Sequence, residues 1–365
     1  MRIRYLIFIL LFITANQIIA QDLPLSSLKL PARYSISVYA NGIPGARQLA
    51  LGENGTVFVG TKGKNVYAIT KSGQQTRVRT IATGLNQPNG VAFRKGALYI
   101  AEINRIVRLD NIETRLDNPP APVVVRNNLP KDTWHGLRYI SFGPDDKLYI
   151  GVGAPCNVCI PTDPVFATIM RMNADGTQYE IFAKGVRNTV GFDWDPETQK
   201  MWFTDNGRDQ MGDNTPPDKL NYAPNKDMHF GFPYHHGKGI PDPEFGNRFP
   251  ESNFTLPTLE LPAHVAALGM KFYKGNVFPS LAGDEAKQIF IAMHGSWNRS
   301  AKVGYKIIRV WICGTNQVIW KEDFITGWLQ NQTAWGRPVD VLGLKDGSLL
   351  ISDDFANVVY QVSYK

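Results

Sequence analysis

Arginine, asparagine and histidine side chains recur in short loops of this sequence, each just before an apolar segment. They are Arg47, Asn89, His135, Arg187 with Asn188, His264 and Arg337. An arginine can bind a carboxylate through two parallel hydrogen bonds, which suits a ligand that carries several carboxylates. A histidine has an ordinary pKa of about 6.5 and can therefore act as a base at neutral pH. If the fold brings these loops together, they form a cationic site with a base beside it.

A repeated segment indicates how the loops could meet. The repeat occurs six times. Its clearest part is a short segment rich in β-branched and aromatic residues, found at residues 56–60, 97–101, 147–151, 200–204, 288–292 and 348–352. A second apolar segment leads into the copies through turns such as Asn-Gly and Asp-Gly, as in β-hairpins. Most copies are roughly 40 to 60 residues apart, which is typical of propeller blades. The sequence therefore predicts an all-β protein, a six-bladed β-propeller.

The interval between the fourth and fifth copies is longer than the others. Residues 206–264 are rich in Pro, Gly and Asp, which predicts a long insertion between the fourth and fifth blades. Such insertions usually lie on the binding face of a repeat protein. No linker divides the chain, so we expect a single propeller domain over residues 21–365. Because the loops that enter the innermost strands of a propeller converge on its axis, the polar side chains are predicted to line that axis.

Residues 1–20 have the pattern of a signal peptide. Arg2 and Arg4 precede an apolar run over residues 5–13, and a second short apolar stretch ends at Ala20. A run of this length does not cross a hydrocarbon core of about 30 Å as a helix. We expect cleavage near Ala20, no stable membrane insertion, and an exported product that is periplasmic or secreted.

The chain is mildly basic. Its formal net charge is +7, and removal of residues 1–20, which contain two arginines and no acid, leaves +5. This charge suits an anionic ligand. No run rich in lysine and arginine concentrates it, so nucleic acid is not an expected partner.

The sequence contains three cysteines, of which Cys156 and Cys159 form a close pair. The pair could be a small disulfide in an oxidising compartment, half of a metal site, or two reduced thiols. Zinc is not expected, because no second pair of Cys or His stands at ligand spacing. The sequence has no Cys-x-x-Cys-His motif, so we expect no attached haem and an external electron acceptor.

Several long motifs resemble the glucose/sorbosone dehydrogenase family, and most closely its sorbosone-dehydrogenase-like branch. These motifs cover residues 135–145, 185–192, 202–209, 229–234 and 294–300, in order along the chain. The resemblance extends over essentially the whole of residues 21–365. It implies a six-bladed propeller that binds pyrroloquinoline quinone (PQQ) on its axis together with a calcium ion.

The resemblance also implies roles for individual residues. His135 matches the family's general base, which takes the proton from the sugar hydroxyl while hydride passes to the quinone. Arg187 and Asn188 match a pair at the cofactor edge, where a cation stabilises negative charge on the reduced quinone and an amide can hydrogen-bond its oxygens. Arg337 matches an arginine that holds a PQQ carboxylate.

Other cofactor contacts are implied less directly. Arg299 falls where glucose-dehydrogenase relatives place a basic residue against the cofactor. Arg47 is predicted to contact the cofactor only because it stands in one of the loops expected at the axis. Gly207 and Arg208 align with the turn whose main-chain carbonyls bind the cofactor calcium, although the glucose dehydrogenases have proline where Arg208 stands. Carbonyl oxygens are suitable ligands for this hard cation.

The expected function is therefore oxidation of a sugar or a sugar aldehyde, with the electrons passed to an external acceptor. Two alternatives stay open at the level of sequence, because one fold supports several functions. A metal-dependent, lactonase-like hydrolase would need acidic side chains on the axis, and Glu102 and Asp340 are the candidates. An exported, non-catalytic ligand-binding propeller would need neither His135 nor the Arg187–Asn188 pair.

Overall fold

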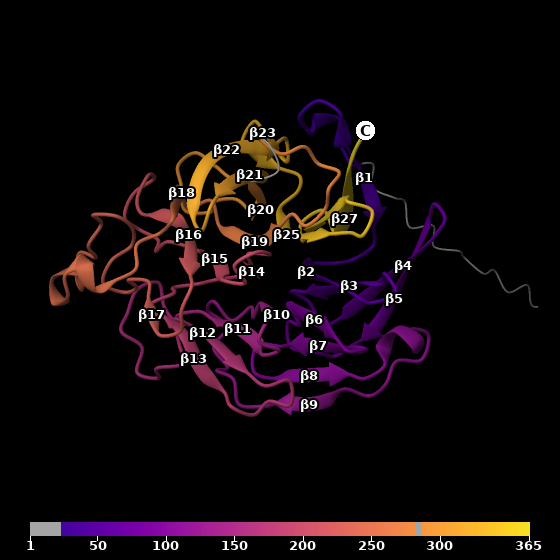
Figure 1. The fold of residues 1–365 in the computed structure, drawn as a ribbon, viewed down its shortest axis with the longest axis horizontal. Helices are drawn as coiled ribbons and strands as arrows, with labels where there is room; N and C mark the ends of the chain where they lie inside the picture. The colour runs from indigo at the N-terminus through magenta and orange to yellow at the C-terminus, as the bar shows by residue number, and fades with distance from the viewer. Residues whose placement is uncertain (1–22, 282–285) are drawn as a thin grey trace, which may run out of the picture.

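The strands of the protein form six sheets that follow one another around a ring. The computed structural model describes residues 23–281 and 286–365, so the signal peptide predicted for residues 1–20 lies outside the described residues. Each sheet is one blade of four or five strands, and the first strand of each blade lies nearest the centre of the ring (Figure 1). The prediction of an all-β, six-bladed propeller is confirmed.

The first three blades come from the N-terminal half of the chain. Blade 1 contains β2 (Ala46–Leu51), β3 (Val57–Thr61), β4 (Val66–Ser72) and β5 (Gln75–Ala82). Blade 2 contains β6 (Gly90–Arg94), β7 (Ala97–Ala101), β8 (Ile106–Leu109) and β9 (Val123–Arg126). Blade 3 contains β10 (Ile140–Phe142), β11 (Leu148–Val152), β12 (Thr168–Met172), β13 (Glu180–Lys184) and β17 (Met228–His229).

The other three blades complete the ring. Blade 4 contains β14 (Phe192–Trp194), β15 (Met201–Asp205), β16 (Pro217–Ala223) and β18 (Leu259–Ala263). Blade 5 contains β19 (Ala267–Phe272), β20 (Lys287–Met293), β21 (Lys306–Cys313) and β22 (Gln317–Ile325). Blade 6 contains β25 (Pro338–Gly343), β26 (Leu349–Asp353), β27 (Val358–Tyr364) and β1 (Tyr34–Ala40).

Blade 6 closes the ring because it combines strands from both ends of the chain. The N-terminal β1 pairs antiparallel with the C-terminal β27, with Tyr34 opposite Tyr364. The inner strand β25 also packs against β2 of blade 1. Closure of the ring leaves only short blade edges, which protects the strands from pairing with other chains.

The six repeated segments of the sequence are the second strands of the six blades: β3, β7, β11, β15, β20 and β26. Every residue of β3, β7, β11, β15 and β26 is buried. Both faces of such a strand pack against a neighbouring blade, so most residues on both faces are apolar. This burial explains why the second strands carry the clearest sequence signal.

The long insertion is not where the sequence predicted it. Within residues 206–264 the structure has two regular strands of blade 4, β16 and β18, and the extra length is the segment 224–258 between them. The insertion therefore lies inside the fourth blade. Strand β16 was not predicted from the sequence because it buries the charged residues Asp218 and Lys219, which are not typical of a core strand. Strand β17 of the inserted segment pairs in parallel with β13 of blade 3.

The remaining elements are short and lie outside the blades. They are the 3-10 turns η1 (Leu25–Ser27), η2 (Ile112–Thr114), η3 (Gly246–Arg248) and η4 (Glu251–Asn253), and the hairpin of β23 (Leu329–Gln330) and β24 (Thr333–Ala334). No helix within the described residues has the length and apolarity needed to span a bilayer.

Candidate active site

Loops from blades 3, 4 and 5 meet around a cavity of about 150 Å³. The loops precede β10, β14 and β19 or follow β15 and β20. The cavity is lined by His135, Arg187, Asn188, Asn206, Gly207, Asp209, Asp218, His264, Ala266 and Trp297. Four of these residues were assigned roles at the site from the sequence, namely His135, Arg187, Asn188 and Gly207, and His264 was predicted to line the axis.

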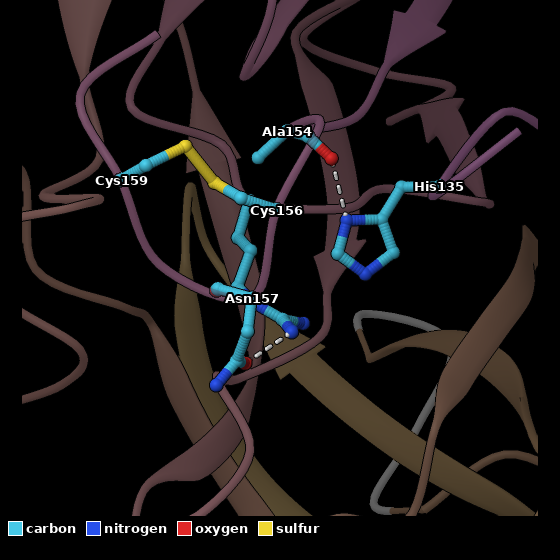
Figure 2. Close-up of a disulfide and its surroundings, with 6 residues drawn as sticks. His135, Ala154, Cys156, Asn157 and Cys159 are labelled. Carbon is cyan, nitrogen blue, oxygen red and sulfur yellow. Dashed lines mark hydrogen bonds between the residues drawn. A yellow bond between two sulfur atoms is a disulfide. The ribbon is translucent and has the colours of Figure 1, made fainter. Parts of the chain in front are cut away.

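His135 combines an unusual backbone conformation with a fixed ring orientation (Figure 2). Its φ of +50° lies in the left-handed region, which side chains other than glycine seldom adopt. Such a conformation costs on the order of 1–3 kcal/mol and is concentrated at functional sites. The Nδ1 atom lies 2.8 Å from the carbonyl oxygen of Ala154. Because a carbonyl only accepts, this contact assigns the proton to Nδ1 and leaves the lone pair on Nε2.

The surroundings of His135 keep its ring uncharged. Burial, and then the positive charge of Arg187, lower the pKa of His135 to about 3. The hydrogen bond to Ala154 and the charge of Asp205 raise the pKa, but they are weaker effects. The imidazole is therefore neutral at pH 7 and can accept a proton. An anionic ligand beside Arg187 would offset the arginine's charge and raise the pKa of His135 towards its usual value.

Gly153 provides the space in which the ring of His135 and the amide of Asn188 sit. A Cβ atom at position 153 would lie 2.5 Å from the Cβ of His135 and 3.0 Å from Oδ1 of Asn188. The first distance is too short for two carbon atoms, and the backbone of His135 cannot move away without leaving its loop. Glycine is required here for close approach.

Arg187 is 3% exposed and is held by protein groups along its guanidinium. Its Nε donates to the carbonyl of Asn157 at 2.8 Å and its Nη2 donates to Oδ1 of Asn157 at 2.9 Å. Nη2 also forms an ion pair with Asp209 at 3.2 Å. A buried cation held in this way is pre-oriented to stabilise negative charge that develops in the cavity.

Asn188 keeps most of its side-chain hydrogen-bonding capacity for a ligand. Its main-chain amide donates to Oδ1 of Asp205 at 2.8 Å, which fixes the residue after Arg187. Its Nδ2 has a partner in Oδ1 of Asn206 at 3.5 Å, at the limit of a hydrogen bond. The Asn188 amide can therefore rebind to an oxygen in the cavity at little cost.

Gly207 begins a turn that is anchored by a buried carboxylate. Its amide donates to Oδ1 of Asp218 at 2.8 Å, and the other oxygen of Asp218 accepts from Ala267 at 3.1 Å. Burial raises the pKa of Asp218 to about 6. Among the described residues, no loop amide or side chain donates to the carbonyl of Gly207 or Arg208. Both carbonyls are therefore available to a cation.

The side chain of Arg208 points away from this turn and into the inserted segment. It pairs with Asp242, which also contacts Nε2 of His236 at 2.8 Å. Arg208 is absent from the residues that line the cavity. Within residues 23–281 and 286–365 the structure has no cluster of three or more His, Cys, Asp or Glu that could hold a metal ion.

The other three predicted arginines also lie outside the cavity lining and bind protein groups. Arg47 is buried, with Nε 2.8 Å from Asn89 Oδ1 and Nη1 3.1 Å from Asp354. Arg337 donates to main-chain carbonyls, at 2.9 Å in the case of Gly295. Arg299 donates to Asn214 Oδ1 at 3.1 Å. Their contacts with a cofactor stay predictions.

Asp209, Trp297 and Asn157 belong to the site but were not predicted to have a role in it. Asp209 pairs with Arg187, and it stands at the end of the motif at residues 202–209. Trp297 lines the cavity and is 71% exposed, and its position between His294 and Arg299 in the motif at residues 294–300 was a signal that could have identified it. Asn157 gave no signal, because its role depends on the path of its loop.

The acids proposed for a hydrolase are not at the cavity. Glu102 is paired with Arg105, with oxygen–nitrogen distances of 2.6 and 2.9 Å. Asp340 is buried and accepts from the amide of Leu49 at 2.8 Å. Neither residue lines the cavity. Of the acids that do, Asp209 is bonded to Arg187 and Asn298, and Asp218 to two main-chain amides.

Comparison with known proteins finds similarity to sugar oxidoreductases over part of the sequence. A family model described as TrAA12-like matches residues 241–323. An uncharacterized protein of Borreliella burgdorferi is 35% identical over 369 residues, which cover 97% of this chain and 96% of that protein. A PQQ-dependent pyranose dehydrogenase of Coprinopsis cinerea is 32% identical over 129 residues, but the match covers 30% of this chain and 16% of that enzyme.

Solved structures share the fold over almost the whole chain. The holo form of the PQQ domain of the Coprinopsis cinerea pyranose dehydrogenase aligns with a TM-score of 0.77 at 18% identity, covering 92% of this chain and 97% of that one. A calcium structure of the family AA12 enzyme of Trichoderma reesei aligns with a TM-score of 0.76 at 17% identity, covering 93% and 97%.

The fold is the six-bladed propeller that these two solved structures share. The match to the TrAA12-like family model and the shared fold agree with the resemblance to the glucose/sorbosone dehydrogenase family. The assignment of the chain to the sorbosone-like branch stays a prediction.

Proposed function

We propose that the protein is a PQQ- and calcium-dependent dehydrogenase that oxidises a sugar or a sugar aldehyde. One observation carries the proposal: the neutral ring of His135, with its lone pair on Nε2, shares a cavity with the buried cation of Arg187 and the amide of Asn188. A base, a cation and an amide are the groups that base-assisted hydride transfer to a quinone needs.

The groups that line the cavity, and the turn that continues from Gly207, fit these cofactors chemically. The free carbonyls of the Gly207–Arg208 turn are oxygen ligands of the kind that calcium prefers. Arg187 and the Asn188 amide suit the oxygens of an anionic quinone. When bound, PQQ would supply the quinone that accepts the hydride. Arg337, Arg299, Arg47 and Arg208 are further proposed contacts for its carboxylates, reached by exchanging their present protein partners.

The chain's own residues would divide the remaining work. Nε2 of His135 would take the proton of the substrate hydroxyl, while Ala154 keeps the Nδ1 proton in place. Arg187, fixed by Asn157 and Asp209, would stabilise the negative charge that develops beside it. Neither residue has to reorganise, because the partners that hold each side chain are already in place.

Trp297 is the proposed substrate platform. It stands on the rim of the cavity with 71% of its surface exposed. A rigid aromatic ring at the mouth of a polar cavity can pack against the apolar face of a sugar at little entropic cost. This contact would affect sugar binding more than the chemical step.

The proposed setting of the enzyme is outside the cytoplasm. Residues 1–20 would act as a signal peptide and residues 21–365 as the single mature domain. The Cys156–Cys159 disulfide favours this setting, because disulfides persist in oxidising compartments. The reduced cofactor would pass its electrons to an external acceptor.

Titration of the metal-stripped protein with PQQ, with and without calcium, tests the proposal. Calcium-dependent binding, followed by absorbance, is the expected result. An Asp175→Asn variant, which changes an exposed acid of blade 3, serves as the control. Absence of PQQ binding at every calcium concentration would remove the proposal and favour a non-catalytic ligand-binding propeller.

A further inference from the structure

The loop that contains the two cysteines contacts residues of the candidate active site. Cys156 and Cys159 form a disulfide within the connection between β11 and β12 of blade 3. Figure 2 shows the disulfide beside Asn157, with Ala154 and the ring of His135 next to it. No other disulfide is present in the described part of the chain, where Cys313 is free.

Asn157, inside this loop, contacts Arg187 through two oxygen atoms. Its main-chain carbonyl accepts from Nε at 2.8 Å and its Oδ1 accepts from Nη2 at 2.9 Å. The same Oδ1 accepts from the amide of Asp209 at 2.8 Å, and Nδ2 donates to the carbonyl of Asp209 at 3.1 Å. Asn157 therefore connects the buried cation with the loop that follows β15.

Ala154, at the start of the same connection, contacts His135, the proposed base. Its carbonyl accepts from His135 and its amide donates to the main-chain carbonyl of Arg187 at 2.8 Å. Residues 154–157 thus touch both the proposed base and the proposed cation. A displacement of this segment would move both groups, and a shift of about 1 Å at reacting groups can cost 100-fold in rate.

Apart from these hydrogen bonds, the segment has only limited apolar packing. Cys156 and Val158 pack against a small apolar cluster formed by Ala154, Ala167 and Phe232. Phe232 itself belongs to the inserted segment rather than to a blade strand. The disulfide is therefore the covalent restraint on a loop with few apolar contacts.

We propose that Asn157 is a positioning residue for Arg187 and that the Cys156–Cys159 disulfide keeps Asn157 in place, so that activity depends on the redox state of this pair. The proposal rests on the function proposed above. Reduction would break the S–S bond, and a dithiol such as dithiothreitol would supply two electrons and two protons and become a cyclic disulfide. The two thiols formed would leave the loop free to move away from Arg187.

A cysteine double variant, Cys156→Ser with Cys159→Ser, tests the restraint. We expect kcat to fall by about tenfold, with KM for the sugar changed by less than about twofold. Dithiothreitol should lower the activity of the wild-type protein by the same factor and leave the double variant unchanged. Cys313→Ser, which removes the free thiol on β21, should respond to dithiothreitol as the wild type does. Full activity of the double variant would overturn the proposal.

A pair of variants at position 157 tests the positioning role. Asn157→Ala removes the Oδ1 acceptor and should lower kcat by about tenfold. Asn157→Asp retains an oxygen acceptor for both Arg187 and the Asp209 amide but loses the Nδ2 donor to the Asp209 carbonyl, so it should retain clearly more activity than Asn157→Ala. Equal losses in the two variants would show that Oδ1 does not position Arg187, and the proposal would fail.

A measurement without PQQ separates this proposal from the function on which it rests. Nuclear magnetic resonance titration of His135 in the cofactor-free protein reports whether the guanidinium of Arg187 stays close to the ring. In the cysteine double variant and in Asn157→Ala, the pKa of His135 should rise, because the positive charge becomes mobile. An unchanged titration in both variants would contradict the proposal, even if the protein binds PQQ.

Discussion

The Nδ1 atom of His135 lies 2.8 Å from the carbonyl oxygen of Ala154, and this contact determines the chemistry that the histidine can perform. It fixes the tautomer, because the carbonyl requires a proton on Nδ1. It also leaves the lone pair on Nε2, in a residue that shares its cavity with Arg187 and Asn188. The base is therefore prepared before any ligand arrives.

The neutral state of His135 predicts how stability depends on pH. Its pKa is lowered to about 3 in the folded protein, whereas an unfolded chain has the ordinary value of about 6.5. The stabilising contribution is therefore complete above about pH 6.5 and is lost, at up to about 1.4 kcal/mol per pH unit, as the pH falls towards 3. Urea denaturation of the cofactor-free protein at pH 7 and pH 5 should show the loss.

A matched variant isolates this effect from that of other histidines. The pKa values of His229, His236 and His294 are also lowered, to about 4, and act in the same direction. His135→Gln should show a smaller difference in stability between pH 7 and pH 5 than the wild type. If the two differences are equal, His135 is not held neutral.

Gly153→Ala should disrupt the site, although it replaces none of the side chains proposed to take part in the chemistry. The new Cβ would lie 2.5 Å from the Cβ of His135, so either the histidine or the loop after β11 must shift. We expect a cost of about 1–3 kcal/mol in stability and a large loss of kcat, measured by denaturation and steady-state kinetics. Gly343→Ala, where nothing lies within 4 Å, should behave like the wild type.

Arg187→Lys tests the fixed cation. Lysine keeps the charge but cannot make the paired contacts with the carbonyl and Oδ1 of Asn157. We expect kcat to fall by about 100-fold, the cost of removing one preorganised group that stabilises charge in the transition state. Arg77→Lys, an exposed arginine beside Asp117 on the outer strand of blade 1, is the control and should retain full activity.

Asp218→Asn tests the turn proposed for calcium. The two oxygens of Asp218 accept from the amides of Gly207 and Ala267, and an asparagine would direct its NH2 group at one of these donors. Calcium affinity, measured by calorimetry in the presence of PQQ, should fall by about tenfold or more. Unaltered affinity would place the calcium elsewhere.

Trp297→Ala should weaken sugar binding with a smaller effect on the chemical step. We expect KM to rise by about tenfold and kcat to change by less than about threefold, because a uniform binding contact is lost. Trp320→Ala, a 55% exposed tryptophan on the outer strand of blade 5, provides the control. A fall in kcat without a change in KM would assign Trp297 to the chemistry instead.

The sequence predicted the blades because their second strands are buried on both faces and therefore consist mainly of apolar residues. It also predicted that His135, Arg187, Asn188 and Gly207 would meet, because each belongs to a long motif beside an inner strand. The position of the insertion was missed, since β16 buries charged residues that a core strand seldom contains.

Side-chain partners that are distant in sequence could not be predicted. Arg47 pairs with Asp354, and the partner comes from the last blade of a closed ring. Asn157 meets Arg187 only because its loop turns back across blade 3. Such contacts depend on loop paths, and neither residue type nor spacing determines these paths.

Sugar-driven reduction of PQQ bound to the protein, followed by absorbance without oxygen, tests the central claim most directly. The calcium-loaded wild type should reduce its cofactor in a single turnover when an aldose or a sugar aldehyde is added. His135→Ala should bind PQQ with similar affinity and reduce it at least about 100-fold more slowly. Equal rates in the two proteins, or no reduction in the wild type with any sugar or sugar aldehyde, would contradict the account.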